Sequence, residues 1–360
     1  MKGIIFDGSE ARATTSLEVR PPGPGEVSVR IAAAGLCHSD CSVIDGTIDW
    51  PAPCVLGHEG AGHIDEVGPG VSGLSPGDPV VLHTLAACGR CRYCSAGRPT
   101  WCRSTFGNRA APFTLDGVPC NNFAASSVWV EKTVVQATQA VPIPADIPMT
   151  SACLIGCGVI TGVGAVLGRA RVQAGETAAV FGIGGVGLNV LQGLRIAGAS
   201  RVIAVDTLAS KRDDALRFGA TDFIVAGDDT VEAVRELTSP GDPTGGVDWA
   251  FECVGAPPVI ETALQTLTWG GNLVIVGVPT ATATATLPIT HLTHVDRGVI
   301  GCRYGSAQPH RDIALYAEYY RAGSLLLDEL VTRTYPLEDF GRAIEDLHAG
   351  QLARGVLTLD

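Results

Sequence analysis

Four closely spaced cysteines are the strongest chemical signal in this 360-residue sequence. They follow the pattern C-x2-C-x2-C-x7-C, in a segment rich in glycine and arginine, at Cys88, Cys91, Cys94 and Cys102. Four thiolates with this spacing can converge on one tetrahedral zinc ion, and because the chain supplies all four ligands, no position remains for a substrate. The spacing therefore predicts a structural zinc site that stabilises a lobe at about residues 84–103.

Two other uses of these cysteines fit the sequence less well. Disulfides are typical of secreted proteins, but the N-terminal residues lack the apolar stretch and cleavage site of a secretory signal, so we expect a cytoplasmic protein. An iron–sulfur cluster also takes four thiolates, yet the dinucleotide motif described next favours hydride chemistry over single-electron transfer. Zinc is therefore the metal that we expect at the four cysteines.

A glycine-rich motif marks a second site, for a dinucleotide. A predicted strand, Thr177–Phe181, leads into G-I-G-G-V-G at residues 182–187, and a helix-forming segment follows. Gly182 permits the tight turn, Gly184 lets a pyrophosphate approach the backbone, and Gly187 lets the helix pack on the strand. The N-terminus of the following helix attracts the phosphates. Strand, motif and helix together predict a Rossmann-type coenzyme site.

An acidic residue at the end of the next strand indicates which coenzyme binds. The predicted strand Arg201–Asp206 ends 24 residues after Gly182, where a carboxylate hydrogen-bonds the adenosine ribose of NAD and repels the 2′-phosphate of NADP. Lys211 is close enough in sequence to contact the same ribose. We therefore expect NAD rather than NADP.

The pattern of apolar residues predicts two domains. Short strands at Glu26–Ala32, His63–Val67 and Pro79–Leu82 indicate that the first part is mainly β. After residue 158, strands alternate with helix-length segments, as in a doubly wound parallel sheet. Its further strands are Asp222–Val225, Val247–Glu252 and Asn272–Gly277. Beyond the sheet we expect helices at Asp312–Ala322 and Leu337–Ala349 and a last strand at Gly355–Leu359, which return to the first domain.

Composition excludes two classes of partner. The chain has 25 lysines and arginines against 37 aspartates and glutamates, so its formal net charge is −12 at pH 7. Such a charge repels nucleic acid and anionic lipid surfaces, and no apolar stretch approaches the length of a membrane span. We expect neither nucleic acid nor membrane as a partner, and a small molecule as substrate.

Three further segments, read with the motifs above, resemble a known family. The segments at residues 35–40, 57–62 and 156–162 are similar to the three metal-ligand loops of the medium-chain zinc alcohol dehydrogenases, in the branch of the liver-type and thiol-dependent formaldehyde dehydrogenases. The resemblance covers nearly the whole chain. It implies a GroES-like catalytic domain at residues 1–158 and 301–360 and a Rossmann NAD domain at residues 159–300.

The resemblance also implies a catalytic zinc site. Cys37, His58 and Cys157 would bind this second zinc ion and leave one position for water or the substrate oxygen. Glu59 would approach the metal as an exchange ligand or orient the site, and Asp40 would fix the ring of His58.

The same resemblance assigns the proton relay. Ser39 matches the hydroxyl residue that takes the alcohol proton. Two positions after Asp40, the liver-type enzymes have a histidine that completes the relay, whereas this chain has Ser42. The outer end of the relay stays open between the coenzyme ribose with water and His38.

By the same resemblance, further residues would contact the coenzyme and the substrate. The expected coenzyme contacts are His38, Thr161, Gly182, Gly184, Gly185, Val186, Gly187, Asp206, Lys211, Val276, Val278 and Arg354, with His38 and Arg354 near the pyrophosphate. The expected substrate pocket contains Ser39, Thr84, Phe123 and Val278. Since Thr84 stands where liver-type relatives carry an aromatic residue, the pocket should accept primary alcohols or aldehydes bulkier than ethanol.

Two other functions stay open at this point. Oxidation of a thiol–formaldehyde adduct is the nearest alternative, because those enzymes share the motifs. A non-enzymatic NAD-binding protein is less consistent with the sequence, because such a protein should have lost metal ligands. The resemblance further implies a homodimer or a dimer-based tetramer, paired through an edge strand near Val295–Gly301.

Overall fold

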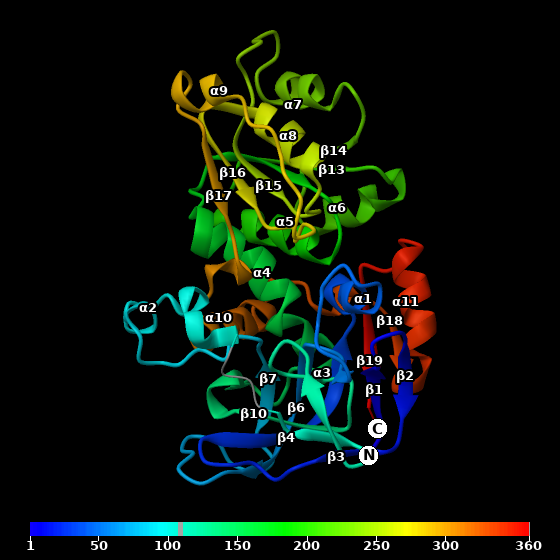
Figure 1. Ribbon diagram of the computed structural model, residues 1–360. Coiled ribbons are helices and arrows are strands. Elements are labelled where there is room, and N and C mark those ends of the chain that lie inside the picture. Colours follow the sequence, from blue (N-terminus) through cyan, green and yellow to red (C-terminus); the bar gives the residue numbers. More distant parts are fainter. Residues whose placement is uncertain (107–110, 360) are drawn as a thin grey trace. The chain divides into compact units, whose positions relative to one another are not determined.

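The computed structural model describes residues 1–106 and 111–359, which form two compact units (Figure 1). Unit 1 comprises the residues up to Gly158 and those from Gln308 onward, and unit 2 is Val159–Ala307. Residues 301–307, which we expected in the catalytic domain, group with unit 2. The reason is local packing, because a Cβ on Gly305 would lie 2.1 Å from the carbonyl oxygen of Ile160.

Unit 1 is built mainly from two β-sheets. One has the order β11-β7-β6-β4-β19-β18, with β10 also paired to β4, and the other has the order β2-β1-β5-β9-β8-β3. The three strands predicted in this part are confirmed within β4, β6 and β7. The strands are β1 Gly3–Phe6, β2 Ala11–Thr14, β3 Leu17–Val19, β4 Glu26–Gly35, β5 Cys54–Val55, β6 Glu59–Val67, β7 Pro79–Leu82, β8 Phe113–Leu115, β9 Val118–Asn122, β10 Lys132–Gln136, β11 Ala140–Pro142, β18 Val331–Pro336 and β19 Arg354–Thr358.

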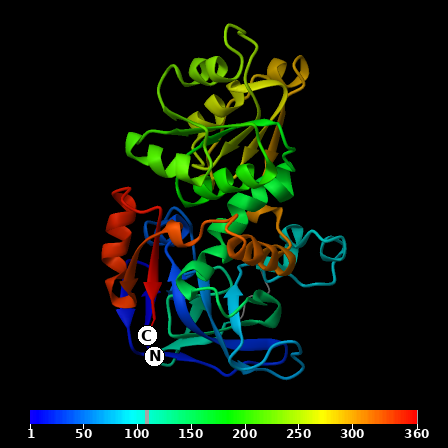
Figure 2. The same cartoon turned by 180° about the vertical axis from the view of Figure 1, so that it is seen from behind.

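The C-terminal part of the chain returns to unit 1, as the sequence predicts. Strand β19 pairs antiparallel with β4, with Val356 opposite Gly35, so the red C-terminal segment lies beside blue N-terminal strands (Figures 1 and 2). The predicted last helix is present as α11. The α-helices of unit 1 are α1 His38–Ile44, α2 Arg92–Ser95, α3 Met149–Ala152, α10 Pro309–Arg321 and α11 Phe340–His348.

Unit 2 has the predicted doubly wound architecture. Its six strands are all parallel and run in the order β14-β13-β12-β15-β16-β17, which in chain order reads 3-2-1-4-5-6. The order reverses between β12 and β15, and this switch point is where such sheets bind their ligands. The strands are β12 Thr177–Phe181, β13 Arg201–Asp206, β14 Asp222–Val225, β15 Val247–Glu252, β16 Leu267–Ile275 and β17 Gly298–Gly301.

One strand of unit 2 differs from its predicted bounds. We expected Asn272–Gly277, whereas β16 begins at Leu267 and ends at Ile275. Its early residues were missed because Trp269 and Gly270 are exposed, so the first half has no continuous buried apolar run. The strand ends early because the backbone N–H of Gly277 turns to donate to the carbonyl of Glu252.

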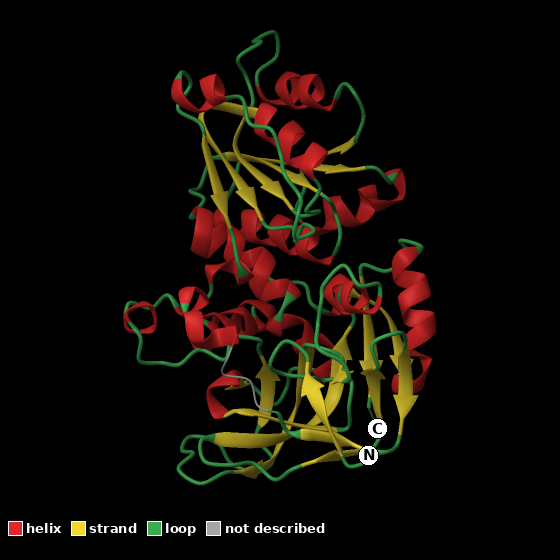
Figure 3. Ribbon diagram, in the orientation of Figure 1, coloured by secondary structure: helices red, strands yellow, loops and turns green. Residues whose placement is uncertain are grey.

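Helices cover both faces of this sheet, with α5 and α6 on one face and α7 and α8 on the other (Figures 1 and 3). The core beneath them is formed by buried strand residues such as Ala179, Ile203 and Leu273. The helices are α4 Gly158–Gly164, which begins at the boundary of the units, α5 Gly185–Ala197, α6 Arg212–Phe218, α7 Thr230–Thr238, α8 Pro257–Gln265 and α9 Ile289–Thr293.

Within the described part of the chain, none of the helices alone has the length and apolar composition needed to cross a membrane. The consecutive helical segments Met149–Gly156 and Gly158–Ala170 meet those criteria only when taken together as a bent pair.

Candidate zinc and coenzyme sites

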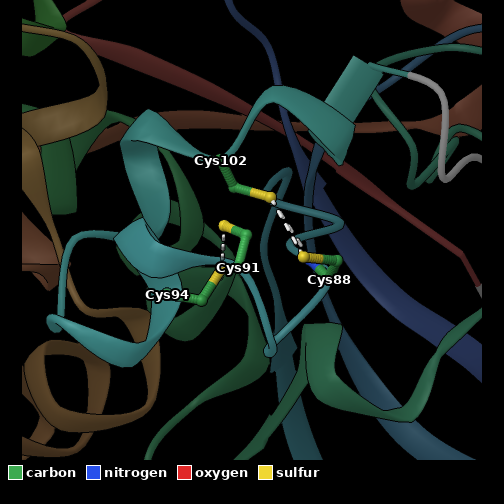
Figure 4. Close-up of side chains that lie close together, drawn as sticks. All are labelled: Cys88, Cys91, Cys94 and Cys102. Atoms are coloured by element: carbon green, nitrogen blue, oxygen red, sulfur yellow. Dashed lines mark hydrogen bonds between the residues drawn. The ribbon is translucent and has the colours of Figure 1, made fainter.

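The four predicted structural ligands converge on one point of unit 1. Cys88, Cys91, Cys94 and Cys102 point their sulfur atoms toward one another from a loop, the helix α2 and the turn that follows it (Figure 4). All four Sγ atoms lie within 4.8 Å of one another. The backbone N–H of Cys88 also donates to the sulfur of Cys102 at 3.4 Å.

The distances between the sulfur atoms fit a tetrahedral zinc ion. The Sγ atoms of Cys91 and Cys94 are 3.5 Å apart, and those of Cys88 and Cys102 are 3.6 Å apart. A disulfide would need about 2.05 Å, whereas four sulfurs at a zinc–sulfur distance of 2.3 Å lie about 3.8 Å from one another. The cluster therefore fits a metal and not a pair of disulfides.

The thiols of this lobe differ in acidity. Backbone N–H groups of Arg90 and Cys91 lower the pKa of Cys88 to about 6. Burial and the neighbouring thiols raise the pKa of Cys94 to about 12. A bound cation is therefore needed to hold all four as thiolates, which is the charge state that a structural zinc site requires.

A second cluster brings together ligands from distant parts of unit 1. Cys37 caps the N-terminus of α1, His58 and Glu59 lie at the start of β6, and Cys157 follows the turn Cys153–Gly156. Their ligand atoms also lie within 4.8 Å of one another. The two clusters together fit two zinc ions.

Asp40 lies behind this second cluster, as predicted. Its Oδ1 is 3.0 Å from Nδ1 of His58 and accepts the backbone N–H of Gly57 at 3.1 Å, while Oδ2 accepts that of Cys37 at 3.2 Å. Burial raises the pKa of Asp40, against the opposing charge of His58. Because Nδ1 faces the carboxylate, Nε2 of His58 is the nitrogen available to a metal.

Glu59 has one paired and one unpaired oxygen. Its Oε1 accepts a hydrogen bond from Nη2 of Arg354 at 2.6 Å, and Oε2 is buried without a hydrogen-bond partner in the described structure. Burial raises the pKa of Glu59 to about 7. An orphaned carboxylate oxygen beside two thiols and an imidazole is what a metal ligand set requires, so these residues fit zinc.

Two glycines make room for this ion pair. A Cβ on Gly35 would lie 2.3 Å from Oε2 of Glu59, and a Cβ on Gly158 would lie 2.0 Å from Nη2 of Arg354. Arg354, which we expected as a phosphate contact, is buried here against Glu59 and the carbonyl of Leu36. Its contact with a phosphate stays a prediction, whereas its pairing with Glu59 was not anticipated.

Aromatic side chains cover one side of His58. The ring of Phe123, a predicted pocket residue, stands edge-on to the His58 ring with centroids 5.5 Å apart. Trp50 packs edge-on against Phe123 at 5.0 Å and was missed by the sequence analysis. Tryptophan followed by proline suggests only a turn, and no spacing rule links Trp50 to His58.

The remaining predicted residues of unit 1 come from the helix α1 and from the segment after β7. His38, Ser39 and Ser42 all belong to α1, where His38 is exposed and the two serines are half-buried. Thr84 is half-buried and follows the end of β7. The backbone carbonyl of Ser42 accepts the N–H of Ile48 at 2.7 Å.

In unit 2, the glycine motif has the geometry that its roles require. Gly182 has a positive φ of 86°, which a tight turn needs, and a Cβ on Gly187 would lie 2.0 Å from the carbonyl oxygen of Gly182. A Cβ on Gly184 would meet no described protein atom within 4 Å, so the backbone there is open to a ligand. The helix α5 begins at Gly185 and includes Val186.

Asp206 is hydrogen-bonded to the glycine-rich turn at residues 182–187. Its Oδ2 accepts the backbone N–H of Ile183 at 2.7 Å and lies 3.0 Å from Nζ of Lys211, and its Oδ1 accepts the N–H of Leu208 at 3.0 Å. Asp206 and Lys211 are thus brought together at the carboxyl end of β13.

The other predicted coenzyme residues of unit 2 differ in exposure. Thr161 on α4 is half-buried, and Val276 is buried directly after β16. Val278, two residues further on, is 68% exposed. The contacts of these residues with a coenzyme stay predictions.

Comparison with known proteins finds zinc-dependent dehydrogenases along nearly the whole chain. Residues 23–145 match the alcohol dehydrogenase GroES-like domain, and residues 185–318 match the zinc-binding dehydrogenase family. An NDMA-dependent alcohol dehydrogenase of Amycolatopsis methanolica is 38% identical over 98% of this chain and 97% of its own. An S-(hydroxymethyl)glutathione dehydrogenase of Paracoccus denitrificans is 36% identical over 95% of both chains.

A solved structure agrees with these relatives. The crystal structure of benzyl alcohol dehydrogenase from Acinetobacter calcoaceticus covers 100% of both chains, with a TM-score of 0.92 and 31% sequence identity. The predicted combination of a GroES-like and a Rossmann-like domain is confirmed. Because these similarities extend over nearly the whole sequence, the chain belongs to the zinc-dependent alcohol dehydrogenases of the medium-chain type.

Proposed function

We propose that this zinc alcohol dehydrogenase acts on primary alcohols or aldehydes with a bulky apolar group and uses NAD as its coenzyme. The observation that carries the proposal is the arrangement around His58, where Phe123 stands edge-on to the imidazole and Trp50 extends the aromatic surface. If Cys37, His58 and Cys157 hold the metal and the substrate oxygen takes its fourth position, an aromatic wall beside His58 favours apolar substituents over the small ethyl group.

The metal would be held by Cys37, His58 and Cys157, with Glu59 close enough to exchange as a ligand. A zinc ion there supplies Lewis acidity that polarises the oxygen of the alcohol or aldehyde. Ser39, two residues after the ligand Cys37 and in the first turn of α1, would take the hydroxyl proton of the alcohol. Asp40 would keep the ring of His58 in the orientation that presents Nε2.

The preference for NAD rests on Asp206. Its carboxylate lies at the carboxyl end of β13, where a ribose would bind, and it would repel a 2′-phosphate. Lys211 lies 3.0 Å from the Asp206 carboxylate, so part of its charge is already compensated and it is less able to attract that phosphate. We expect Asp206→Gly to weaken or reverse the preference. Equal kcat/KM for NAD and NADP in the unmodified enzyme would exclude it.

A substrate panel tests the function. Purified enzyme with zinc and NAD is offered ethanol, benzyl alcohol, longer primary alcohols and S-(hydroxymethyl)glutathione, and NADH absorbance is followed. We expect kcat/KM for benzyl alcohol to exceed that for ethanol. A higher value for ethanol would refute the proposed pocket.

The thiol adduct is the second candidate substrate, because a relative of that name is 36% identical over 95% of this chain. The panel separates the two functions. Turnover of S-(hydroxymethyl)glutathione far above that of every simple alcohol would make the adduct the substrate.

We also propose a homodimer or dimer-based tetramer paired through unit 2. Strand β17, Gly298–Gly301, lies at the edge of the parallel sheet, and its residues are half-buried or exposed. Such an edge is a template for pairing with a second copy. Light scattering that reports a monomer at micromolar concentration would exclude this assembly.

A further inference from the structure

Glu252 is the last residue of β15, which lies next to β12 at the switch point of the unit 2 sheet. Its side chain is fully buried, and burial raises the pKa of the carboxyl. One carboxylate oxygen, Oε2, has no hydrogen-bond partner in the described structure. A buried acid that is only half satisfied is costly, so its position calls for an explanation.

Glu252 joins two loops at the carboxyl edge of the sheet. Its Oε1 accepts the backbone N–H groups of Val254 and Gly255, both at 2.7 Å. Its main-chain carbonyl accepts those of Val276 and Gly277 at 2.8 and 2.9 Å. Four donors from the loops after β15 and β16 therefore meet at one residue.

The same loops are packed with almost no space between them. A Cβ on Gly277 would lie 2.1 Å from the backbone nitrogen of Gly255, and a Cβ on Gly255 would lie 2.6 Å from the carbonyl carbon of Val278. A Cβ on Gly182 would lie 2.5 Å from Cγ2 of Val254. A shift of the loop after β15 would therefore displace both the glycine motif and the loop after β16.

Two valines in these loops, Val254 and Val278, are exposed. Val254 is 50% exposed and Val278 is 68% exposed, at the edge of the sheet that also carries Gly182. Exposed apolar side chains beside a glycine-rich turn at a switch point form a surface suited to a flat heteroaromatic ring.

We propose that Glu252 is a positioning residue for the coenzyme: through the N–H groups of Val254 and Gly255 it fixes the loops that receive the nicotinamide half of NAD. It acts through backbone and does not itself touch the coenzyme. This inference rests on the NAD-binding function proposed above.

The same strand supplies a matched control. Asp248, near the amino end of β15, accepts the backbone N–H and the hydroxyl of Thr177, both at 2.8 Å. It also uses a carboxylate to tie two strands together, but four residues away, about 13 Å along an extended strand. Its loss should destabilise unit 2 without reaching the coenzyme edge.

The experiment compares Glu252→Ala, Glu252→Gln and Asp248→Ala in full-length, zinc-loaded enzyme. NADH binding is measured by fluorescence titration, unfolding by thermal scan, and KM for NAD and kcat by steady-state kinetics. For Glu252→Ala we expect the Kd of NADH to rise by about 10-fold or more, since the two hydrogen bonds that hold the loop N–H groups of Val254 and Gly255 are lost. KM for NAD should rise with it, while kcat at saturating NAD changes less.

The two other variants separate positioning from general stability. Glu252→Gln keeps an oxygen acceptor and should restore most of the affinity, and Asp248→Ala should lower the melting temperature without changing the Kd. Equal Kd values for the wild type and both Glu252 variants, or equal Kd losses in Glu252→Ala and Asp248→Ala, would overturn the inference. If Glu252→Ala does not fold, Glu252→Asp, whose shorter side chain cannot reach both N–H groups, takes its place. A wild type that fails to bind NADH would instead refute the proposed function.

Discussion

The two metal centres of unit 1 use similar ligands but are assembled in different ways. The four-cysteine cluster takes its ligands from residues 88–102, whereas the second cluster, which we propose to be catalytic, joins Cys37, His58, Glu59 and Cys157 from across the first 157 residues. A short loop can supply a closed site by itself. An open site that must also hold a substrate needs ligands from several elements, which fix its geometry independently.

The surroundings of the two centres differ as well. Backbone N–H groups satisfy sulfur atoms in the lobe, such as that of Cys102. At the second cluster, the ligands are fixed by side chains instead. Asp40 contacts Nδ1 of His58, and Arg354 donates a hydrogen bond to Glu59. We therefore expect the lobe, whose ligands come from one short segment, to depend on its metal for stability, and the second cluster to depend on neighbouring side chains for its geometry.

The largest effect should come from removing one ligand of each centre. Cys157→Ser should abolish turnover with a modest loss of stability, because sheets support that site. Cys94→Ser should destabilise the lobe by several kcal/mol, because metal binding there contributes folding free energy. Metal analysis of each variant should report about one zinc ion instead of two. Identical melting curves for the two variants would contradict this division of roles.

The next effect tests proton transfer beside the catalytic centre. Ser39→Ala should lower kcat by about 10²-fold, the lower end of the usual contribution of a general acid or base. Ser39→Thr keeps the hydroxyl and should stay active. Ser42→Ala is the matched control on the same helix and should change kcat little. A loss in Ser42→Ala as large as in Ser39→Ala would mean that both serines form the relay.

A smaller effect, on zinc affinity, should follow from changing Asp40, which contacts the ligand His58. Asp40→Asn keeps the size of the side chain but removes the charge facing Nδ1 of His58, so zinc affinity at the catalytic centre should fall by about 10- to 100-fold. Competition with a chelator measures this loss, and the zinc of the four cysteines should be retained. Simultaneous loss of both ions would show that the centres are coupled.

The smallest effect concerns the point where the lobe leaves the sheet. His83 is buried after β7, its Nε2 lies 2.8 Å from the carbonyl of Thr138, and burial lowers its pKa to about 3. In the unfolded chain the ring titrates near 6.5, so below that pH only the unfolded state gains the proton. Stability should therefore fall by about 1.4 kcal/mol per pH unit as the pH drops from 6.5.

His83→Gln removes this titration while keeping a donor and an acceptor, so its free energy of unfolding should depend less on pH between 6.5 and 5.5. Denaturant unfolding at several pH values measures the difference. His348→Gln is the control, since His348 is an exposed histidine at the end of α11, whereas His310 packs against His83 and helps to lower its pKa. If His83→Gln and the wild type have equal slopes, the buried ring is not the source of the pH dependence.

The sequence by itself determined those features that neighbouring residues specify. The spacing of Cys88 to Cys102 requires only one loop, and the strands of unit 2 carry apolar runs that end in glycine or acid, so β12, β13 and β15 were predicted with their observed bounds. The ligands of the catalytic centre were inferred by resemblance to a family. Their spacing alone does not bring them together.

Only the tertiary structure decided which distant side chains meet. Arg354 pairs with Glu59, 295 residues earlier in the chain, because β19 returns to lie beside β4. Trp50 and Phe123 meet near His58, and Glu252 ties together loops that follow two different strands. None of these contacts has a periodic signal, because a long-range contact depends on how strands pair and pack and not on the residues adjacent in the chain.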